Sequence, residues 1–131
     1  EPAADALIAE RDLGGRVERR IDDFAAAAAE TPPADLVILH RVICCYPDAH
    51  VLIDAACGHA HERVAITIPR ESAWIRFGVV VMNAWLRMRR IAFRTYVHPL
   101  EPMLAAAGRR GFRMADRRRG ILWQSFVLER V

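Results

Sequence analysis

The chain has 131 residues, of which 53% are hydrophobic, so it is long enough for one domain with a sizeable core. Its formal net charge of +3 is too small to indicate nucleic-acid binding without a clustered basic patch. Every basic residue other than histidine is arginine, which is typical of a GC-rich genome rather than of an arginine-specific function. Three cysteines, two of them adjacent, predict no disulfide framework, and no secretion signal opens the chain, so a cytoplasmic location is expected.

The first part of the chain predicts three short elements. Residues 3–12 have the pattern of a short amphipathic helix, which a Gly-Gly pair ends. Residues 16–21 (RVERRI) predict a strand that ends at two aspartates and a phenylalanine. Residues 25–30 predict one or two helical turns before a Pro-Pro pair.

The middle of the chain predicts two buried strands around a helix. Residues 35–43 (DLVILHRVI) form an apolar, β-branched run, which indicates a strand covered on both faces. Residues 48–61 predict a helix with its apolar side chains on one side. Residues 63–68 (RVAITI) predict a second buried strand, which the following proline ends.

A long apolar segment follows. Residues 71–90 predict one long helix or a pair of helices with a basic C-terminal end, which suits the negative end of a helix dipole. Its apolar core, residues 73–86, is interrupted by Arg76 and Asn83 and is shorter than the roughly 20 residues that a membrane span needs. No membrane span is therefore predicted.

The C-terminal part predicts a helix and a strand pair. Residues 99–107 form the helix, and residues 112–118 and 121–130 form two strands around a glycine. The alternation of strands and helices predicts an α/β fold with a mostly parallel sheet and a C-terminal antiparallel strand pair. Ligands of such sheets bind at the carboxyl ends of the strands, so the residues that follow each strand are the candidates for a site.

Four segments, in this order, resemble class I S-adenosylmethionine-dependent methyltransferases. They are RVERRIDDF (the third strand of that family), ADLVILHRVICCYPD (the fourth), RVAITIPR (the fifth) and GFRMADRRRGILWQSFVLER (the sixth and seventh). Within the family, the loop of the type HxxxxxYP is similar to that of magnesium-protoporphyrin and related small-molecule O-methyltransferases. The resemblance implies a three-layer Rossmann-like fold, S-adenosylmethionine as the cofactor, and methyl transfer to a small, largely apolar acceptor.

The resemblance also implies cofactor residues. The carboxylate of Asp23 would contact the adenine amine and the backbone N–H of Phe24 the adenine ring, with Asp22 in that role if the register differs by one residue. His40 and Arg41 end the fourth strand, where cofactor and acceptor should meet. His40 is the candidate for a catalytic base or an acceptor-orienting group, since its unperturbed pKa lies near working pH. The alternatives are a solvated carboxylate for Asp23, a hydrogen-bonded structural histidine for His40 and a solvent-facing Arg41.

Residues 71–98 resemble the insertion that caps the acceptor pocket in this family. The candidate acceptor residues are Tyr46, Trp74, Trp85, Tyr96 and His98. Core packing of the aromatic residues and a solvated loop at RTYVHP are the alternatives. A zinc site at the cysteines and histidines is disfavoured by their spacing. The arginines near the final strands favour a solvated hairpin over a nucleic-acid surface, because no aromatic residues interleave with them.

The family's glycine-rich motif, E/D-x-G-x-G, is absent from this sequence, and the Gly-Gly pair at 14 and 15 has the wrong spacing. Residues 1–131 are therefore interpreted as a single, N-terminally incomplete methyltransferase domain, inactive by itself. We expect a further N-terminal segment of about one βαβ unit, ~30 residues or more. The alternative function is a non-catalytic, methyltransferase-like scaffold or partner-binding domain. The apolar helix and an open sheet edge also make a homodimer an expectation.

Overall fold

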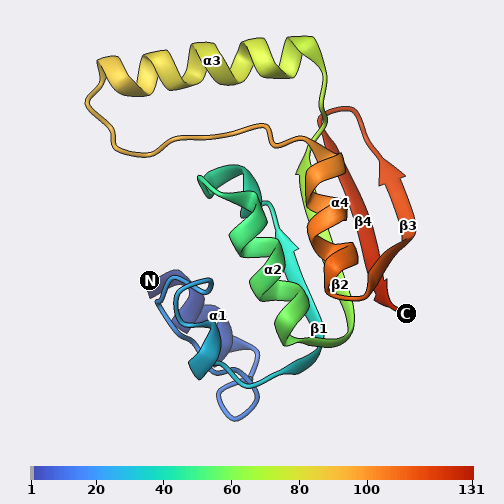
Figure 1. Cartoon of the computed structure of the whole chain (residues 1–131). Helices are drawn as coiled ribbons and strands as arrows, with labels where there is room; N and C mark the ends of the chain where they lie inside the picture. Colours follow the sequence, from blue (N-terminus) through green and yellow to red (C-terminus); the bar gives the residue numbers. More distant parts are fainter. Residues whose placement is uncertain (1) are drawn as a thin grey trace.

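The computed structural model describes residues 2–131 (Figure 1). Its elements follow in the order α1 (Pro2–Glu10), the 3-10 turn η1 (Ala28–Glu30), β1 (Ala34–His40), the 3-10 turn η2 (Ile43–Cys45), α2 (Ala49–His59), β2 (Ala60–Pro69), α3 (Ala73–Met88), α4 (Leu100–Arg109), β3 (Phe112–Arg119) and β4 (Trp123–Arg130). All the expected helices are present with slightly shifted ends. The Asp48 side chain caps α2 by accepting the backbone N–H groups of His50 and Val51.

Four strands form one sheet in the order β1-β2-β4-β3. β1 pairs with β2 in parallel, which places His40 opposite Thr67. β4 runs antiparallel to both β2 and β3. The structure thus confirms a partial Rossmann-like α/β fold with a C-terminal antiparallel pair, in which the sheet is mixed and one of its pairings is parallel.

Two helices, α2 and α4, cover one face of the sheet (Figure 1). Their inward side chains, Ile53 and Met103 among them, belong to the same buried cluster as Val64, Ile66 and Phe126 of the strands. Burying each large apolar side chain contributes about 1.5–3 kcal/mol. This face therefore supplies most of the hydrophobic stabilisation.

The other face of the sheet and one edge of β1 are open. Leu36 and Ile38, which point away from α2, are 47% and 64% exposed. β1 is the terminal strand of the sheet, so the backbone groups along its outer edge have no strand partner within residues 2–131. An open apolar face beside an open edge is unusual for a sheet that ends there.

The strand predicted at residues 16–21 is not formed, and this segment is irregular between α1 and η1. A strand obtains its backbone hydrogen bonds from a neighbour. Within residues 2–131, no strand lies beside this segment to supply those bonds. The local pattern was therefore overridden by the lack of a partner.

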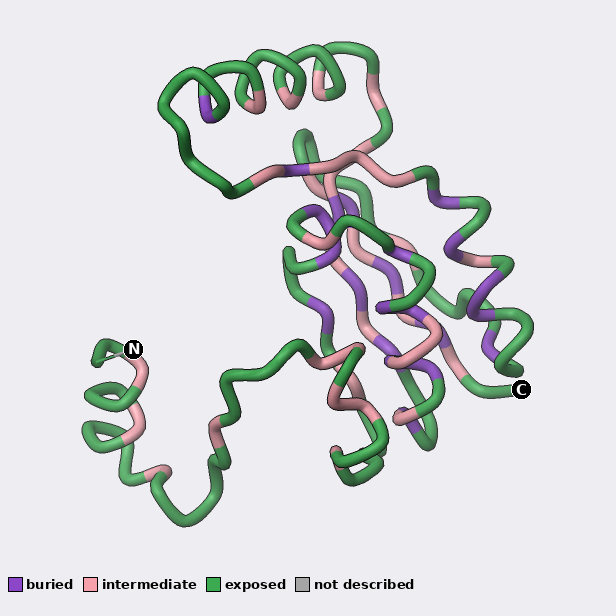
Figure 2. Tube along the Cα trace, turned by 60° about the vertical axis from the view of Figure 1, so that its left-hand side comes forward, coloured by how far each residue is buried: buried purple, intermediate pink, exposed green. Residues whose placement is uncertain are grey.

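α3 is one helix, and it stands apart from the sheet beyond the carboxyl ends of β1 and β2 (Figures 1 and 2). Residues 91–98, called the strap below, run back beneath it in an extended conformation. Asn83 joins the two: its Nδ2 donates to the Thr95 carbonyl at 2.8 Å, and its Oδ1 accepts the Thr95 N–H at 3.0 Å. The strand-like RTYVHP pattern gives a strap rather than a strand, because no strand lies beside it. Within residues 2–131, no helix combines the length and the apolarity needed to cross a bilayer.

The open face predicts how two lysine substitutions differ. We expect Ile38→Lys to change the free energy of unfolding by no more than about 0.5 kcal/mol, because the side chain is largely exposed, and to reduce aggregation of the chain. Leu39→Lys, the matched control, buries a charge in the core and should prevent folding. Light scattering and urea denaturation measure both effects. If the Ile38→Lys protein folds but scatters as much light as wild type, this face of the sheet is not the surface that causes aggregation.

Candidate functional site

β1 ends at a sharp change of backbone direction. The N–H of Arg41 still donates to the Thr67 carbonyl at 3.1 Å, which adds one more bond to the parallel pairing. Arg41 itself has φ of 56°, a left-handed conformation that costs a residue with a Cβ about 1 kcal/mol. The chain then leaves the sheet into η2. His40 is thereby left exposed at the carboxyl end of β1.

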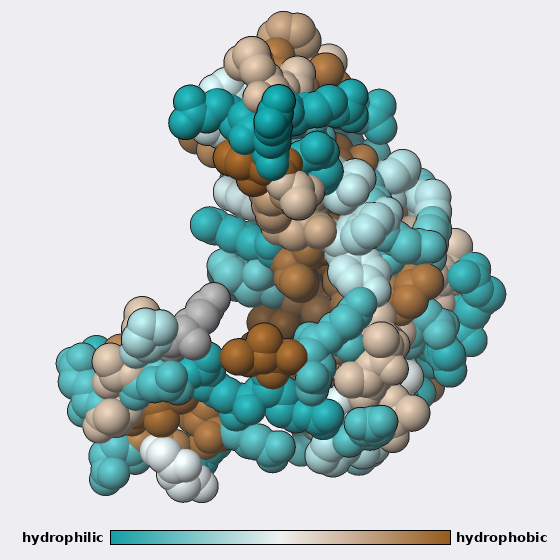
Figure 3. Space-filling view, turned by 90° about the vertical axis from the view of Figure 1, so that its left-hand side faces the viewer, coloured by the Kyte–Doolittle hydropathy of each residue, from teal (hydrophilic) through white to brown (hydrophobic). Residues whose placement is uncertain are grey.

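His40 lines an open pocket of about 400 Å³ together with Phe24 and residues of β1 and α2. The remaining lining residues are apolar: Val37, Ile38, Leu39, Val42 and Leu52. Residues 2–33, which precede β1, are called the N-terminal arm below. Figure 3 shows the apolar floor of the hollow between this arm and α3. Among the described residues, none forms a hydrogen bond with the His40 side chain. This arrangement differs from that of a hydrogen-bonded structural histidine.

Asp23 lies beside the loop that follows β1 and is hydrogen-bonded to Tyr46 of that loop. The Tyr46 hydroxyl donates to both carboxylate oxygens of Asp23, at 3.1 and 3.2 Å, and the Ala25 N–H donates to Oδ1 at 3.0 Å. The N–H of Phe24 has no acceptor within residues 2–131. A carboxylate and an unused backbone donor are thus adjacent, which is the pair that a ring carrying both an amine and an acceptor nitrogen requires.

The strap closes over this cluster. The Nε2–H of His98 donates to the Tyr46 carbonyl at 2.9 Å, and the Tyr96 N–H donates to the Cys44 carbonyl at 2.7 Å. The Tyr96 and His98 rings lie 5.6 Å apart on the same side of the strap. Asp23, Tyr46 and His98 therefore form one connected chain of contacts that comes from three separate parts of the sequence.

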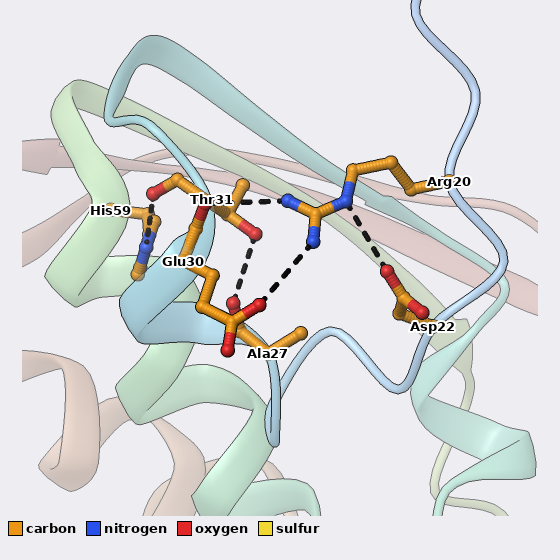
Figure 4. Close-up of polar contacts among 6 residues, drawn as sticks. All are labelled: Arg20, Asp22, Ala27, Glu30, Thr31 and His59. Atoms are coloured by element: carbon orange, nitrogen blue, oxygen red, sulfur yellow. Dashed lines mark hydrogen bonds and ion pairs between the residues drawn. The ribbon is translucent and has the colours of Figure 1, made fainter.

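The segment that carries Asp23 is tied to α2 through His59 (Figure 4). The two ring nitrogens of His59 contact the carbonyls of Ala55 and Thr31, each at 3.0 Å, and the ring meets that of Phe24 edge-on at 5.4 Å. Arg20 bonds the Glu30 carbonyl and also holds Asp22 at 3.2 Å. Asp22 is thus engaged by Arg20, whereas Asp23 is engaged by Tyr46.

Three of the predicted site residues lie elsewhere. The Arg41 guanidinium stacks over the Trp123 ring at 4.6 Å. Trp74 and Trp85 lie on α3 with 57% and 49% of their surface exposed, and the Arg89 guanidinium lies 5.6 Å from the Trp85 ring. None of the three lines the pocket of His40, and of the other predicted site residues only Phe24 and His40 do so.

Two of the three cysteines, Cys44 and Cys57, are buried as free thiols. Burial raises the pKa of Cys44 and of Cys57 to about 11, so both remain thiols near neutral pH. Within residues 2–131, no group of three or more His, Cys, Asp and Glu side chains is placed to hold a metal ion.

Sequence reasoning missed the apolar wall of the pocket. Val37 and Leu39 point to one face of the sheet, and Ile38 and His40 point to the other, yet all four line the same pocket. This is possible because the pocket runs along the open edge of β1. A period-two pattern separates the two faces of a strand but carries no signal for which edge is free.

The bond between Tyr46 and Asp23 predicts a stability effect with a defined pH dependence. Partial burial raises the pKa of Tyr46, and the neighbouring Asp23 raises it further. The bond needs the protonated hydroxyl, so its contribution is present below the ordinary tyrosine pKa of about 10 and is lost as pH rises through the raised pKa of the folded state. We expect Tyr46→Phe to lower the free energy of unfolding by about 1 kcal/mol or less at pH 7, because the bond is solvent-accessible.

Urea denaturation of both proteins between pH 7 and 11 measures this difference. Tyr96→Phe is the matched control, since the Tyr96 hydroxyl has no hydrogen bond in the described part of the chain. A difference between wild type and Tyr46→Phe that stays constant up to pH 11 would show that the bond does not contribute.

Comparison with known proteins gives structural matches only. No protein-family model matches the sequence, and no curated protein is significantly similar to it. The structure resembles magnesium protoporphyrin IX methyltransferase (ChlM) from Synechocystis PCC 6803 with bound SAH, with a TM-score of 0.72 and 18% identity over 98% of this chain and 57% of that one. It also resembles an O-methyltransferase family protein from Burkholderia thailandensis (TM-score 0.73, 20% identity, 98% and 40% covered).

A third match is the pyocyanin biosynthetic protein PhzM, with a TM-score of 0.63 and 20% identity over 98% of this chain and 39% of that one. The chain spans about two fifths to three fifths of the length of these proteins. At such identities the matches establish the fold. The chain has the partial Rossmann-like fold of class I S-adenosylmethionine-dependent methyltransferases, equivalent to their C-terminal part.

Proposed function

We propose that this chain belongs to an enzyme that transfers a methyl group from S-adenosylmethionine to a small, largely apolar acceptor. One observation carries the proposal. Asp23 and Phe24 from the N-terminal arm, His40 from β1, and Tyr46 from the following loop meet at the carboxyl end of a parallel strand. Ligands of open α/β sheets bind at this edge.

The open edge and open face of β1 support a further part of the domain. Leu36 and Ile38 have no covering layer, and the pocket beside Val37 and Leu39 follows the unpaired edge. We propose that an additional strand pairs with β1 and carries the glycine-rich loop that residues 1–131 lack. Such a strand would fill the lower part of the pocket and leave the end beside Phe24 and His40 for the cofactor.

The residues present fit the adenine end of S-adenosylmethionine. Asp23 offers carboxylate oxygens for the exocyclic amine, and Phe24 offers an unused N–H for a ring nitrogen. Tyr46 orients the Asp23 carboxylate through two contacts. Arg20 already binds the Asp22 carboxylate, which supports the proposal that Asp23 is the adenine-binding residue.

The cofactor would supply an electrophilic methyl group, and the protein would align the acceptor with it. Alignment alone supplies much of the rate of a displacement. His40 has a ring free of hydrogen bonds within residues 2–131, so it is available to orient an acceptor hydroxyl or to take its proton. The wall of the pocket is apolar, which suits a largely apolar acceptor.

Residues 71–98 would act as a lid in which the strap, rather than α3, contacts the acceptor. Tyr96 and His98 are held against the loop after β1 by the bonds to the Cys44 and Tyr46 carbonyls. Trp74 and Trp85 lie on the far side of α3 from the strap and have no part in this pocket. Substitution of His98 should therefore affect acceptor binding more than substitution of Trp74.

Calorimetric titration with S-adenosylhomocysteine tests the cofactor site. We expect micromolar binding by a polypeptide that carries residues 1–131 together with the proposed preceding strands, and binding weaker by ~100-fold or more by residues 1–131 alone. In the longer protein, Asp23→Asn should weaken binding about tenfold, equivalent to about 1.4 kcal/mol. Asp22→Asn is the matched control and should leave binding unchanged. Absence of heat from the longer protein would reject the enzyme in favour of the scaffold function.

A second measurement concerns His40 once an acceptor is found. His40→Ala should lower kcat about 100-fold or more if the ring takes a proton, and leave cofactor binding within about twofold. His40→Gln would separate the two roles, since an amide restores orientation but not proton transfer. A kcat equal to that of wild type in both variants would exclude His40 from the reaction.

A further inference from the structure

The outward face of α3 carries a stripe of large apolar side chains that has no partner in the described chain. We call these residues the outer stripe: Trp74, Phe77, Val81, Trp85 and Met88. They are 57%, 70%, 51%, 49% and 74% exposed, in that order. At 100° per residue they fall within an arc of about 80° and extend over about 21 Å. Scattered exposed apolar residues are ordinary, but a continuous row of this kind marks an interaction surface.

The outer stripe points away from the rest of the molecule. The opposite side of α3 faces the strap, where Asn83 bonds Thr95 and Leu86 is buried. The strap lies between α3 and the sheet in two views (Figures 1 and 2), so the side of α3 away from the strap does not face the sheet. A second molecule can therefore reach the stripe without meeting the domain behind it.

The spacing of the stripe is symmetric about its central residue. Trp74 and Met88 lie seven residues before and after Val81, and Phe77 and Trp85 lie four before and four after it. Two copies of such a helix, packed antiparallel about a two-fold axis at Val81, place Trp74 against Met88 and Phe77 against Trp85. This self-complementarity is what an isologous interface requires, whereas a lipid surface requires apolar area without any such symmetry.

Gly78 gives a second, independent sign. A glycine inside a helix costs about 1 kcal/mol relative to alanine. A Cβ at Gly78 would meet no atom within 4 Å in this chain, so no contact within residues 2–131 explains the glycine. In the antiparallel pair, Gly78 lies on the same flank as Trp85 of the second copy and at nearly the same height, so it leaves a notch for that indole ring.

We propose that the outer stripe is the interface with a second copy of this chain, formed by α3 packing antiparallel to α3 about Val81. Arg76 and Arg87 lie on the far side of the helix from the stripe and remain in solvent, so like charges are not brought together. The stripe offers less than the roughly 800 Å² per partner of a standard stable interface, so we expect a weak dimer with a dissociation constant on the order of 10 µM. The proposal does not depend on the proposed function.

A cysteine placed on the two-fold axis tests the geometry. In the full chain with Cys45→Ser, which removes the one exposed thiol, Val81→Cys should give a disulfide-linked dimer under mild oxidation. The two Cβ atoms on the axis would lie near the roughly 4 Å that a disulfide needs. Val80→Cys is the matched control, because Val80 is more exposed than Val81 (65% against 51%) but is turned by about 100°, and it should crosslink at least tenfold more slowly. Equal crosslinking rates would overturn the proposal.

Light scattering after gel filtration, from 1 to 200 µM, tests the interface without added thiols. Wild type should change from monomer to dimer in this range. Trp85→Glu and Gly78→Leu should remain monomeric and folded, because both positions are open in the single chain, while Arg76→Gln should behave as wild type. A monomer throughout, or a dimer that survives both substitutions, would overturn the proposal. A monomer that sediments with phosphatidylglycerol vesicles through Trp85 would assign the stripe to a lipid surface instead.

Discussion

The parallel pairing of β1 with β2 determines where the candidate site lies. Its register sets His40 opposite Thr67, and the Arg41 N–H adds one last bond before the chain turns out of the sheet. The left-handed conformation of Arg41 releases the chain at this point. The loop that follows carries Tyr46 back over the N-terminal arm, where it meets Asp23. Without this pairing, His40, Tyr46 and Asp23 would lie in unrelated parts of the molecule.

The elements that the sequence predicts well are those whose stability is local or shared with a covered face. α2 has an aspartate cap, an apolar side and a clear end, and β2 alternates between buried and less buried residues along its length. Residues 16–21 have an equally good strand pattern, yet they form none, because a strand depends on a neighbour that the local sequence does not describe. Patterns therefore predicted what each segment can form and not whether its partner is present.

The sequence predicted that the candidate site lies at the end of a strand, but it did not predict which aromatic residues lie near it. Asp23, Phe24 and His40 were singled out because each follows or ends a predicted strand. β1 does end at His40, whereas the strand expected before Asp23 is not formed, and Phe24 still lines the same pocket as His40. The aromatic residues of α3 could not be placed in the same way. Helical periodicity puts Trp74 and Trp85 on one face but does not say whether that face points to the pocket or to solvent. The strap determines which face of α3 points to solvent, because Thr95 of the strap bonds Asn83 on the face opposite Trp74 and Trp85.

The two edges of the sheet differ in a way that bears on the proposed additional strand beside β1. β3 is an edge strand with charged residues over most of its length, namely Arg113, Asp116, Arg117, Arg118 and Arg119, and charges of this kind prevent the pairing of a further strand. β1 is the other edge, and between Asp35 and His40 it carries only Leu36, Val37, Ile38 and Leu39. A sequence that protects one edge and leaves the other apolar is consistent with a true boundary at β3 and an interior position for β1.

The two unpartnered surfaces of the molecule, the edge of β1 and the outer stripe of α3, also differ from each other. The edge of β1 needs backbone hydrogen bonds from another strand. The outer stripe of α3 has its backbone bonds satisfied within the helix and needs only apolar contact, so the two surfaces require different kinds of contact.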